Sequence, residues 1–254
     1  MMAATTPLGL QGRAFSVSGR RVLVVGAARS GLAAAELLAA RGAQVTLTDR
    51  AATIPGEDHL RGLGVALDLG GHDAALFIGA DLIVTSPGVP PELAPLAAAR
   101  AAGVPVIGEL ELASRWLAGK VIAITGTKGK STTTTLVGRM LEASGLRALV
   151  GGNIGVPLSA HVEASTPDTW HVVEASSFQL ETTDTFHPAI AALLNLSADH
   201  LDRHPDEASY AAAKARIFAN QTAADWKVLN ADQPETLALA AGTHVVQLHA
   251  ATPA

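Results

Sequence analysis

The residues best suited to chemistry form a glycine loop, Gly126-Thr-Lys-Gly129-Lys130-Ser131-Thr132. An apolar run precedes this loop and a helical pattern follows it, and backbone N–H groups at such a junction can cradle a phosphate. Lys130 can neutralise charge on β- and γ-phosphates, and the Ser131 hydroxyl can reach Mg²⁺. The spacing departs from GxxxxGK[ST], because Ile124 stands where the first glycine belongs. The sequence therefore predicts a compressed P-loop, with a Gly/Thr turn and a solvated lysine as the alternative.

Further polar residues follow later apolar runs in the second half of the chain. Glu174 closes the run that begins near Trp170, where a P-loop sheet carries a metal-binding acid. His200 lies in an Asp- and His-rich segment, residues 195–204, that offers ligands to a metal or a phosphate. Each feature has a structural alternative. The polar residues after Glu174 could be helix caps, a lone histidine is more often structural than a ligand, and Lys214 could be a solvated cation.

The first half carries a weaker phosphate signal. The segment GAARSG, residues 26–31, follows an apolar run, but Ala28 replaces the second glycine of GxGxxG. Asp49 closes the next run, at the position of the ribose-binding acid in a dinucleotide fold. The segment SPG, residues 86–88, follows a third run. Nucleotide binding is one interpretation, and turns that serve only chain packing are the other.

Short apolar runs without polar alternation predict parallel strands that are covered on both faces. The predicted strands span 21–26, 44–49, 81–86, 104–108, 121–126, 147–151, 170–175, 190–196, 227–230 and 244–248. Alanine- and leucine-rich segments predict helices at 31–41, 92–102, 131–144, 206–220 and 234–241. The alternation predicts the α/β class with doubly wound parallel sheets. Together with the glycine segments that follow the runs at 21–26 and 121–126, it predicts an N-terminal Rossmann-like parallel-sheet domain followed by a P-loop-type α/β ATP-binding domain.

The expected organisation is a lead-in at 1–19, a first domain at 20–115 and a second at 119–254. The lead-in has a transit peptide as its alternative interpretation. No closing helix follows the last predicted strand. We therefore expect the second domain to be incomplete at its C-terminus.

Composition excludes several classes of protein. The 254 residues are 48% hydrophobic and 16% charged, which is typical of a globular chain. Eighteen Lys and Arg against 23 Asp and Glu give a net charge of −5, which argues against a broad basic face for nucleic acid. Absence of cysteine excludes a disulfide scaffold, a thiolate zinc site and a cysteine nucleophile. No apolar run approaches the ~20 residues of a membrane span, so we expect no membrane partner. The absence of cysteine fits a cytoplasmic protein, which we expect to be a monomer.

Together these segments resemble the Mur ligase superfamily, the ATP-dependent amide ligases of peptidoglycan precursor synthesis. The matching segments occur in the family's order: GTKGKSTTTTL, GGNIG, EASSFQLET, LNLSADHLDRH and YAAAKARIF. SSFQLET is the most discriminating segment and resembles the D-glutamate-adding branch. Lys128 departs from that branch, which more often has Asn there, and the difference bears on phosphate affinity.

The resemblance implies a role for each matching residue. The ATP phosphates would be held by Gly126, Thr127, Lys128, Gly129, Lys130, Ser131 and Thr132. Magnesium would be held by Ser131, Glu174, His200 and Lys214, and the catalytic residues would be Lys130, His200 and Lys214. The UDP substrate would contact Arg29, Ser30, Gly31, Asp49, Arg50, Ser86, Gly88, Asn153, Ser176 and Gln179, the last three at its muramoyl-alanine end. Lys214 matches the lysine that the family carbamylates with CO₂, which would make it a carboxylate-like metal ligand.

The implied reaction joins D-glutamate to UDP-N-acetylmuramoyl-L-alanine through an acyl phosphate, with ATP and Mg²⁺ as cofactors. In the family, a third, C-terminal domain carries the D-glutamate site, and we expect residues 1–254 alone to be inactive because they lack it. A sibling or folate-polyglutamate-type ligase is one alternative. SSFQLET argues against the siblings, and the N-terminal UDP-type domain argues against the folate relatives. A non-catalytic nucleotide-binding module is the other alternative.

Overall fold

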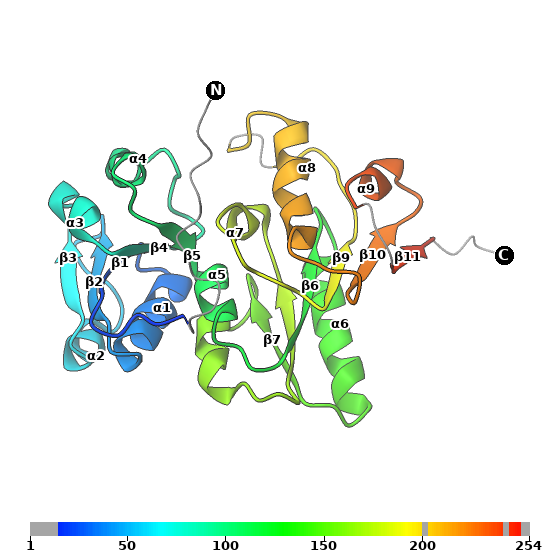
Figure 1. Ribbon diagram of the computed structural model, residues 1–254, viewed down its shortest axis with the longest axis horizontal. Coiled ribbons are helices and arrows are strands. Elements are labelled where there is room, and N and C mark those ends of the chain that lie inside the picture. The colour runs from blue at the N-terminus through cyan, green and yellow to red at the C-terminus, as the bar shows by residue number, and fades with distance from the viewer. Residues whose placement is uncertain (1–14, 200–202, 241–243, 250–254) are drawn as a thin grey trace.

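The computed structural model describes residues 15–199, 203–240 and 244–249. Two parallel α/β units stand side by side, the first coloured from blue to green and the second from green to red (Figure 1). The first sheet has the order β3-β2-β1-β4-β5 and the second the order β11-β10-β9-β6-β8-β7. Each pairing in both sheets is parallel. The predicted α/β class with two parallel sheets is therefore confirmed.

Helices cover both faces of the first sheet. Its strands are β1 (Arg21–Val25), β2 (Gln44–Asp49), β3 (Ala66–Leu69), β4 (Leu82–Thr85) and β5 (Val106–Gly108). Its helices are α1 (Arg29–Ala40), α2 (Glu57–Gly62), α3 (Ala74–Gly79), α4 (Ala94–Ala101) and α5 (Glu109–Ser114). Val22 and Val24 of β1 pack with Leu38 of α1, whereas Leu23 packs with Phe77 of α3 on the opposite face. This period of two explains why β1 is apolar throughout.

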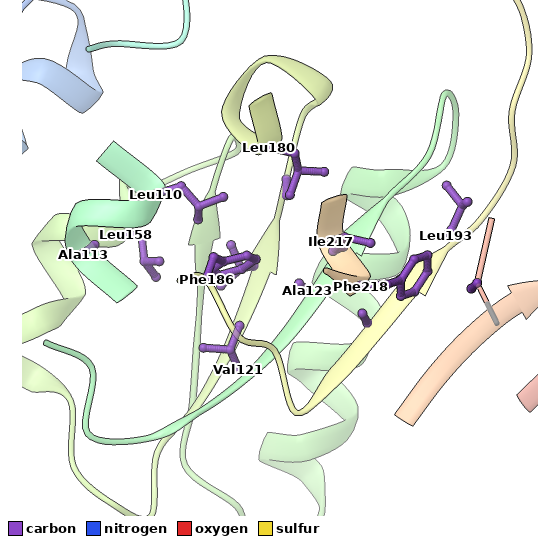
Figure 2. Close-up of a cluster of buried hydrophobic side chains, with 14 of the residues drawn as sticks. Leu110, Ala113, Val121, Ala123, Leu158, Leu180, Phe186, Leu193, Ile217 and Phe218 are labelled. Carbon is purple, nitrogen blue, oxygen red and sulfur yellow. The ribbon is translucent and has the colours of Figure 1, made fainter. Parts of the chain in front are cut away.

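The second sheet is covered in the same way. Its strands are β6 (Lys120–Thr125), β7 (Ala148–Gly152), β8 (Trp170–Glu174), β9 (Ile190–Leu193), β10 (Trp226–Asn230) and β11 (Val245–Leu248). Its helical segments are α6 (Lys130–Ala143), η1 (Leu158–Ala164), α7 (Ser177–Glu181), α8 (Glu207–Ala215), η2 (Arg216–Phe218) and α9 (Pro234–Ala238). Val121 and Ala123 of β6 pack with Leu180, Ile217 and Phe218 (Figure 2). Ile122 and Ile124 pack on the other face with Leu141 of α6.

A buried carboxylate joins α5 to the chain that follows α7. The Glu111 side chain is fully buried, and Oε2 accepts hydrogen bonds from the backbone N–H groups of Asp184 (2.8 Å), Thr185 (3.0 Å) and Phe186 (3.0 Å). Its Oε1 accepts from Thr185 Oγ1 (2.6 Å) and from Arg115 Nε (2.7 Å). Because so many donors converge on one charged group, this contact fixes α5 against the second unit.

The structure departs from the sequence prediction where elements are short or meet the site. The strand predicted to reach 196 ends at Leu193, because Asn195 turns toward the glycine loop. The helix predicted over 206–220 ends at Ala215 and tightens into the 3₁₀ segment η2. The prediction missed β3, α2, α3, η1 and α7. Among the described helices, none combines the length and apolar character that a membrane crossing needs.

Candidate active site

The glycine loop connects β6 to α6 through two unusual backbone conformations. Gly126 has a φ of 148° and Gly129 a φ of 81°, both in the region that favours glycine. Gly129 is the N-cap of α6, so the helix begins at Lys130. The first N–H groups of α6 have no partner within the helix, which suits them to an anion. The Lys130 ammonium donates to the Thr127 carbonyl at 2.9 Å, so its charge lies over the loop.

Asn195 holds the loop from the neighbouring strand end. Its Oδ1 accepts from the backbone N–H groups of Thr127 (3.1 Å) and Lys128 (2.9 Å), and its Nδ2 donates to the Lys128 carbonyl (3.0 Å). Asn195 opens the polar segment 195–204 but was not predicted individually as a site residue. The sequence feature that could have indicated this role is the position of Asn195 just beyond β9, the strand that pairs directly with β6. The N–H groups of Thr127 and Lys128 are thus already bonded to Asn195. A phosphate would therefore be bound by the N–H groups at the start of α6.

Three predicted site residues meet at the end of β8. Glu174 is 1% exposed, and its Oε2 accepts from Ser131 Oγ at 2.7 Å. Its Oε1 accepts from Asn153 Nδ2 at 2.8 Å, and its backbone carbonyl accepts from the Asn153 N–H at 2.9 Å. The carboxylate thus links the strand ends of β7 and β8 to the first turn of α6.

Lys214 of α8 points into the same region. It is 1% exposed, and its Nζ donates to the Gly126 carbonyl at 2.9 Å. The ammonium also lies 4.5 Å from the ring centre of Tyr210, whose hydroxyl is 3.3 Å from Thr127 Oγ1. Burial, and then the nearby positive charge of Lys130, lower the pKa of Lys214 to about 7. Lys214 is therefore not the solvated cation of the alternative interpretation.

The oxygen atoms of the site can be compared with the ligands that Mg²⁺ prefers. Ser131 Oγ and Glu174 Oε2, 2.7 Å apart, are the hard oxygen donors that Mg²⁺ prefers. Within the described ranges, no group of three or more His, Cys, Asp and Glu side chains could hold a metal. The Ser131 and Glu174 oxygens fit a Mg²⁺ ion, a cation that commonly takes its remaining ligands from substrate phosphates and water. His200, the other predicted ligand, lies outside the described residues.

The first unit has its own tight turn between β1 and α1. Asp49 Oδ2 accepts from the Ala27 N–H at 2.6 Å, and the Ser86 hydroxyl donates to the Gly26 carbonyl at 2.9 Å. A Cβ on Gly31 would lie 1.8 Å from the same carbonyl, so only glycine fits there. Several predicted UDP contacts thus surround one turn at the carboxyl edge of the first sheet. Ser30 lies in the first turn of α1 beside it.

Two of the predicted contacts at the muramoyl-alanine end form a helix cap. Ser176 Oγ accepts from the Gln179 N–H at 3.2 Å, and Gln179 Oε1 accepts from the Ser176 N–H at 3.0 Å. The helix-cap alternative is therefore confirmed for this pair. Gln179 is 2% exposed, and its Nε2 is among the buried groups without a hydrogen-bond partner in the described part of the chain.

Contacts between the units bring their carboxyl edges together. Arg29, just after β1, donates from Nη1 to the Gly155 carbonyl of the β7 end at 3.0 Å. Arg203 donates from the second unit to the Pro87 carbonyl, just after β4, at 3.0 Å. Arg50 and Gly88 are exposed on the first unit.

A parallel sheet whose central strand ends in a glycine loop, beside a buried acid and a buried lysine, is an arrangement typical of P-loop proteins. The Mur ligase middle domain matches residues 124–252, and the Mur ligase MurD-like, N-terminal domain matches residues 20–108. The chain belongs to the Mur ligase family.

Two curated relatives show which members of the family this chain is similar to. The chain is similar to the UDP-N-acetylmuramoylalanine--D-glutamate ligases of Acidobacterium capsulatum and Anaeromyxobacter dehalogenans. The first is 52% identical over 219 residues, which cover 85% of this chain and 48% of the relative. The second is 54% identical over 231 residues, which cover 88% of this chain and 49% of the relative. The chain thus spans about half the length of the curated relatives it matches.

Solved structures share the fold. The UDP-N-acetylmuramate:L-alanyl-gamma-D-glutamyl-meso-diaminopimelate ligase of Neisseria meningitides aligns with a TM-score of 0.62 at 22% identity, covering 91% of this chain and 78% of that one. The UDP-N-acetylmuramate-alanine ligase of Thermotoga maritima aligns with a TM-score of 0.52 at 22% identity, covering 89% and 53%. At these identities the alignments support the two-unit fold alone.

Proposed function

We propose that this chain supplies the sugar-nucleotide and ATP sites of a ligase that joins D-glutamate to UDP-N-acetylmuramoyl-L-alanine. The observation that carries the proposal is the convergence of Ser131, Asn153 and buried Lys214 on the Glu174 carboxylate and the glycine loop. The choice of D-glutamate as the amino acid is supported by the 52% and 54% sequence identity between this chain and two D-glutamate ligases. Residues 20–115 bind the UDP substrate in this proposal, and residues 119–254 bind ATP.

The second unit holds the phosphates of ATP. The N–H groups at the start of α6 face the phosphate oxygens, and Lys130 leaves the Thr127 carbonyl to neutralise charge on the γ-phosphate. Mg²⁺, when bound by Ser131 and Glu174, neutralises phosphate charge and polarises the γ-phosphoryl group. Cationic groups fixed in advance lower the barrier because negative charge accumulates as the phosphoryl group transfers.

The chemistry has two balanced steps. A carboxylate oxygen of the muramoyl-alanine substrate forms a bond to the γ-phosphorus, while the bond from that phosphorus to the β–γ bridging oxygen breaks and ADP leaves. The amine of D-glutamate then forms a bond to the acyl carbon, inorganic phosphate leaves, and the nitrogen loses a proton to water. Asn153, whose amide lies beside Glu174 at the end of β7, orients the acyl end of the substrate in this proposal.

Lys214 becomes a carbamate in this proposal. Its lowered pKa of about 7 leaves a large neutral fraction at neutral pH, and only the neutral amine attacks CO₂. A bond forms between Nζ and carbon, and one proton passes to solvent. The product is an anion beside Lys130. Its formation removes the repulsion between the ammonium groups of Lys214 and Lys130, and it adds an oxygen donor near Glu174.

The partners follow from this reaction. They are ATP, UDP-N-acetylmuramoyl-L-alanine and D-glutamate, and the protein works as a cytoplasmic monomer without nucleic acid or membrane. The test is phosphate release by a polypeptide that extends this chain through the full length of its relatives. Release should require ATP, Mg²⁺, the UDP substrate and D-glutamate together. Equal release with L-alanine or meso-diaminopimelate in place of D-glutamate would exclude the proposed specificity, and release without any amino acid would favour a simple nucleotidase.

A further inference from the structure

One arginine of the second unit reaches into the first where the two carboxyl edges meet. Arg203 Nη1 donates to the Pro87 carbonyl at 3.0 Å, and Nη2 donates to the Val89 carbonyl at 3.2 Å. Both carbonyls belong to residues 86–91, the segment that follows β4. A planar guanidinium with two parallel donors holds two carbonyls in a fixed direction, which a single ammonium does not.

Arg203 is also oriented from its own side. Its guanidinium carbon lies 4.2 Å from the ring centre of Phe178, which attracts the cation through its π face. Phe178 stacks in turn on His204, whose Nε2 is 3.0 Å from Ser177 Oγ. His204 is 2% exposed. The arginine is therefore set in a fixed orientation by the chain around α7 before it contacts the first unit.

The space beside this contact is open. A cavity of about 180 Å³ lies between the units, lined by Ser86 and Val89 of the first and by Phe178, Thr182 and Arg203 of the second. Arg203 lies along this cavity, so truncating it enlarges an existing space and does not leave a hole in a packed core. We therefore expect the Arg203→Ala protein to fold.

The segment that Arg203 holds connects directly to the turn of the predicted UDP site. Ser86, its first residue, donates from its hydroxyl to the Gly26 carbonyl at 2.9 Å. Val89 N–H donates to the Ser86 carbonyl at 3.0 Å, which makes the segment a compact turn. A displacement of Pro87 and Val89 therefore moves Ser86 and disturbs the turn between β1 and α1.

We propose that Arg203 is a positioning residue that fixes residues 86–91 of the first unit against the second. It keeps a sugar nucleotide bound at the first carboxyl edge aligned with the glycine loop. The part of this inference that concerns the sugar nucleotide rests on the proposed function, whereas the ordering of residues 86–91 does not.

The experiment compares Arg203→Ala and Arg203→Lys with the matched control Arg41→Ala. Arg41 also links the units, through a 2.7 Å ion pair with Glu163, but it lies far along the chain from residues 86–91. Hydrogen exchange at the Gly88 and Val89 amides reports the order of the segment. Calorimetry with UDP-N-acetylmuramoyl-L-alanine and with ATP reports the two affinities, and thermal melts verify that each variant is folded.

In Arg203→Ala, exchange at Val89 should accelerate and affinity for the UDP substrate should fall about tenfold, since two charge-assisted hydrogen bonds are lost. Affinity for ATP should not change. Arg203→Lys should recover part of both effects, because it restores the charge without the paired donors. Arg41→Ala should leave exchange and both affinities at the wild-type values.

Each other outcome is decisive. Unchanged exchange at Val89 in a folded Arg203→Ala protein would overturn the inference. Faster exchange with an unchanged affinity for the UDP substrate would show that the segment is held but does not position substrate, which also overturns it. If the wild-type chain binds no UDP compound, the proposed function fails, and the exchange data still decide whether Arg203 orders the segment.

Discussion

Replacement of Glu111 by glutamine should destabilise the protein strongly, although the two side chains have the same shape. The carboxylate is fully buried and accepts from three backbone N–H groups, from the Thr185 hydroxyl and from Arg115. Glutamine has one acceptor oxygen, so its NH₂ group must face donors at the other end and Arg115 loses its counter-charge. Removing one partner of such a buried pair costs about 3–5 kcal/mol.

The pH dependence of this loss has a definite sign. Burial alone raises the pKa of Glu111, but the hydrogen bonds from Thr185, Asp184 and Arg115 outweigh it and hold the pKa below its ordinary value of 4.5. The unfolded chain therefore takes up this proton at a higher pH than the folded chain. The stabilisation by Glu111 is fully present above about pH 4.5 and is lost as the pH falls through the lowered value.

Thermal melts of wild type and Glu111→Gln at several pH values test this reasoning. At pH 7 the variant should melt roughly 10 °C lower, at about 2–4 °C per kcal/mol for a chain of this size. The gap should narrow below pH 4.5. Burial also lowers the pKa of His171 to about 4, which weakens both proteins equally below its ordinary 6.5, so the difference between them isolates Glu111. Glu163→Gln, which alters a carboxylate that is 71% exposed, is the control and should barely shift the melt. A variant that melts with wild type at pH 7 would refute the reasoning.

Three further changes test the sites. Gly31→Ala forces a Cβ to within 1.8 Å of a carbonyl oxygen and should cost about 3 kcal/mol or more in urea unfolding, whereas Gly88→Ala points into open space and should cost little; equal losses would contradict the geometry. Lys130→Ala in the full-length protein should reduce kcat of the proposed ligase reaction by orders of magnitude, and normal turnover would refute the phosphate-loop role. Lys214→Ala should abolish turnover, and small carboxylates should restore part of it. An active alanine variant, or no carbamate signal after ¹³C-bicarbonate labelling of wild type, would argue against the carbamate.

Central strands were predictable from sequence because they are buried on both faces. The apolar runs of β1, β4 and β6 leave no polar alternation, and their boundaries matched within a residue or so. The edge strand β3 was not predictable in this way, since Ala66–Leu69 is short, interrupted by Asp68 and only partly buried. The predicted helix over 206–220 was too long because alanine-rich composition does not reveal where a helix tightens into a 3₁₀ turn.

Site residues that belong to one continuous motif could be predicted from the sequence. Contacts that depend on which strands are neighbours in the sheet could not. Spacing alone placed Lys130 and Ser131 at the start of a helix, and Glu174 at a strand end. That Glu174 contacts Ser131 depends on β8 lying next to β6. The Asn195 contact with the loop depends likewise on β9 lying on the other side of β6. The role of Glu111 could not be predicted from sequence, because its backbone donors come from residues 184–186, about 70 positions away in the chain.

The contact of the two carboxyl edges, at Arg29 with Gly155 and at Arg203 with Pro87, also bears on how a ligand travels between the units. A molecule anchored at one edge is tethered beside the other. Its free end meets the second edge at an effective concentration in the millimolar range or above, without a second encounter by diffusion. Most of the entropy of bringing two reactants together is then lost when the first end binds. The two sites together therefore discriminate between ligands by length. A ligand that is too short does not reach the second edge, and one that is too long gains less from the tether.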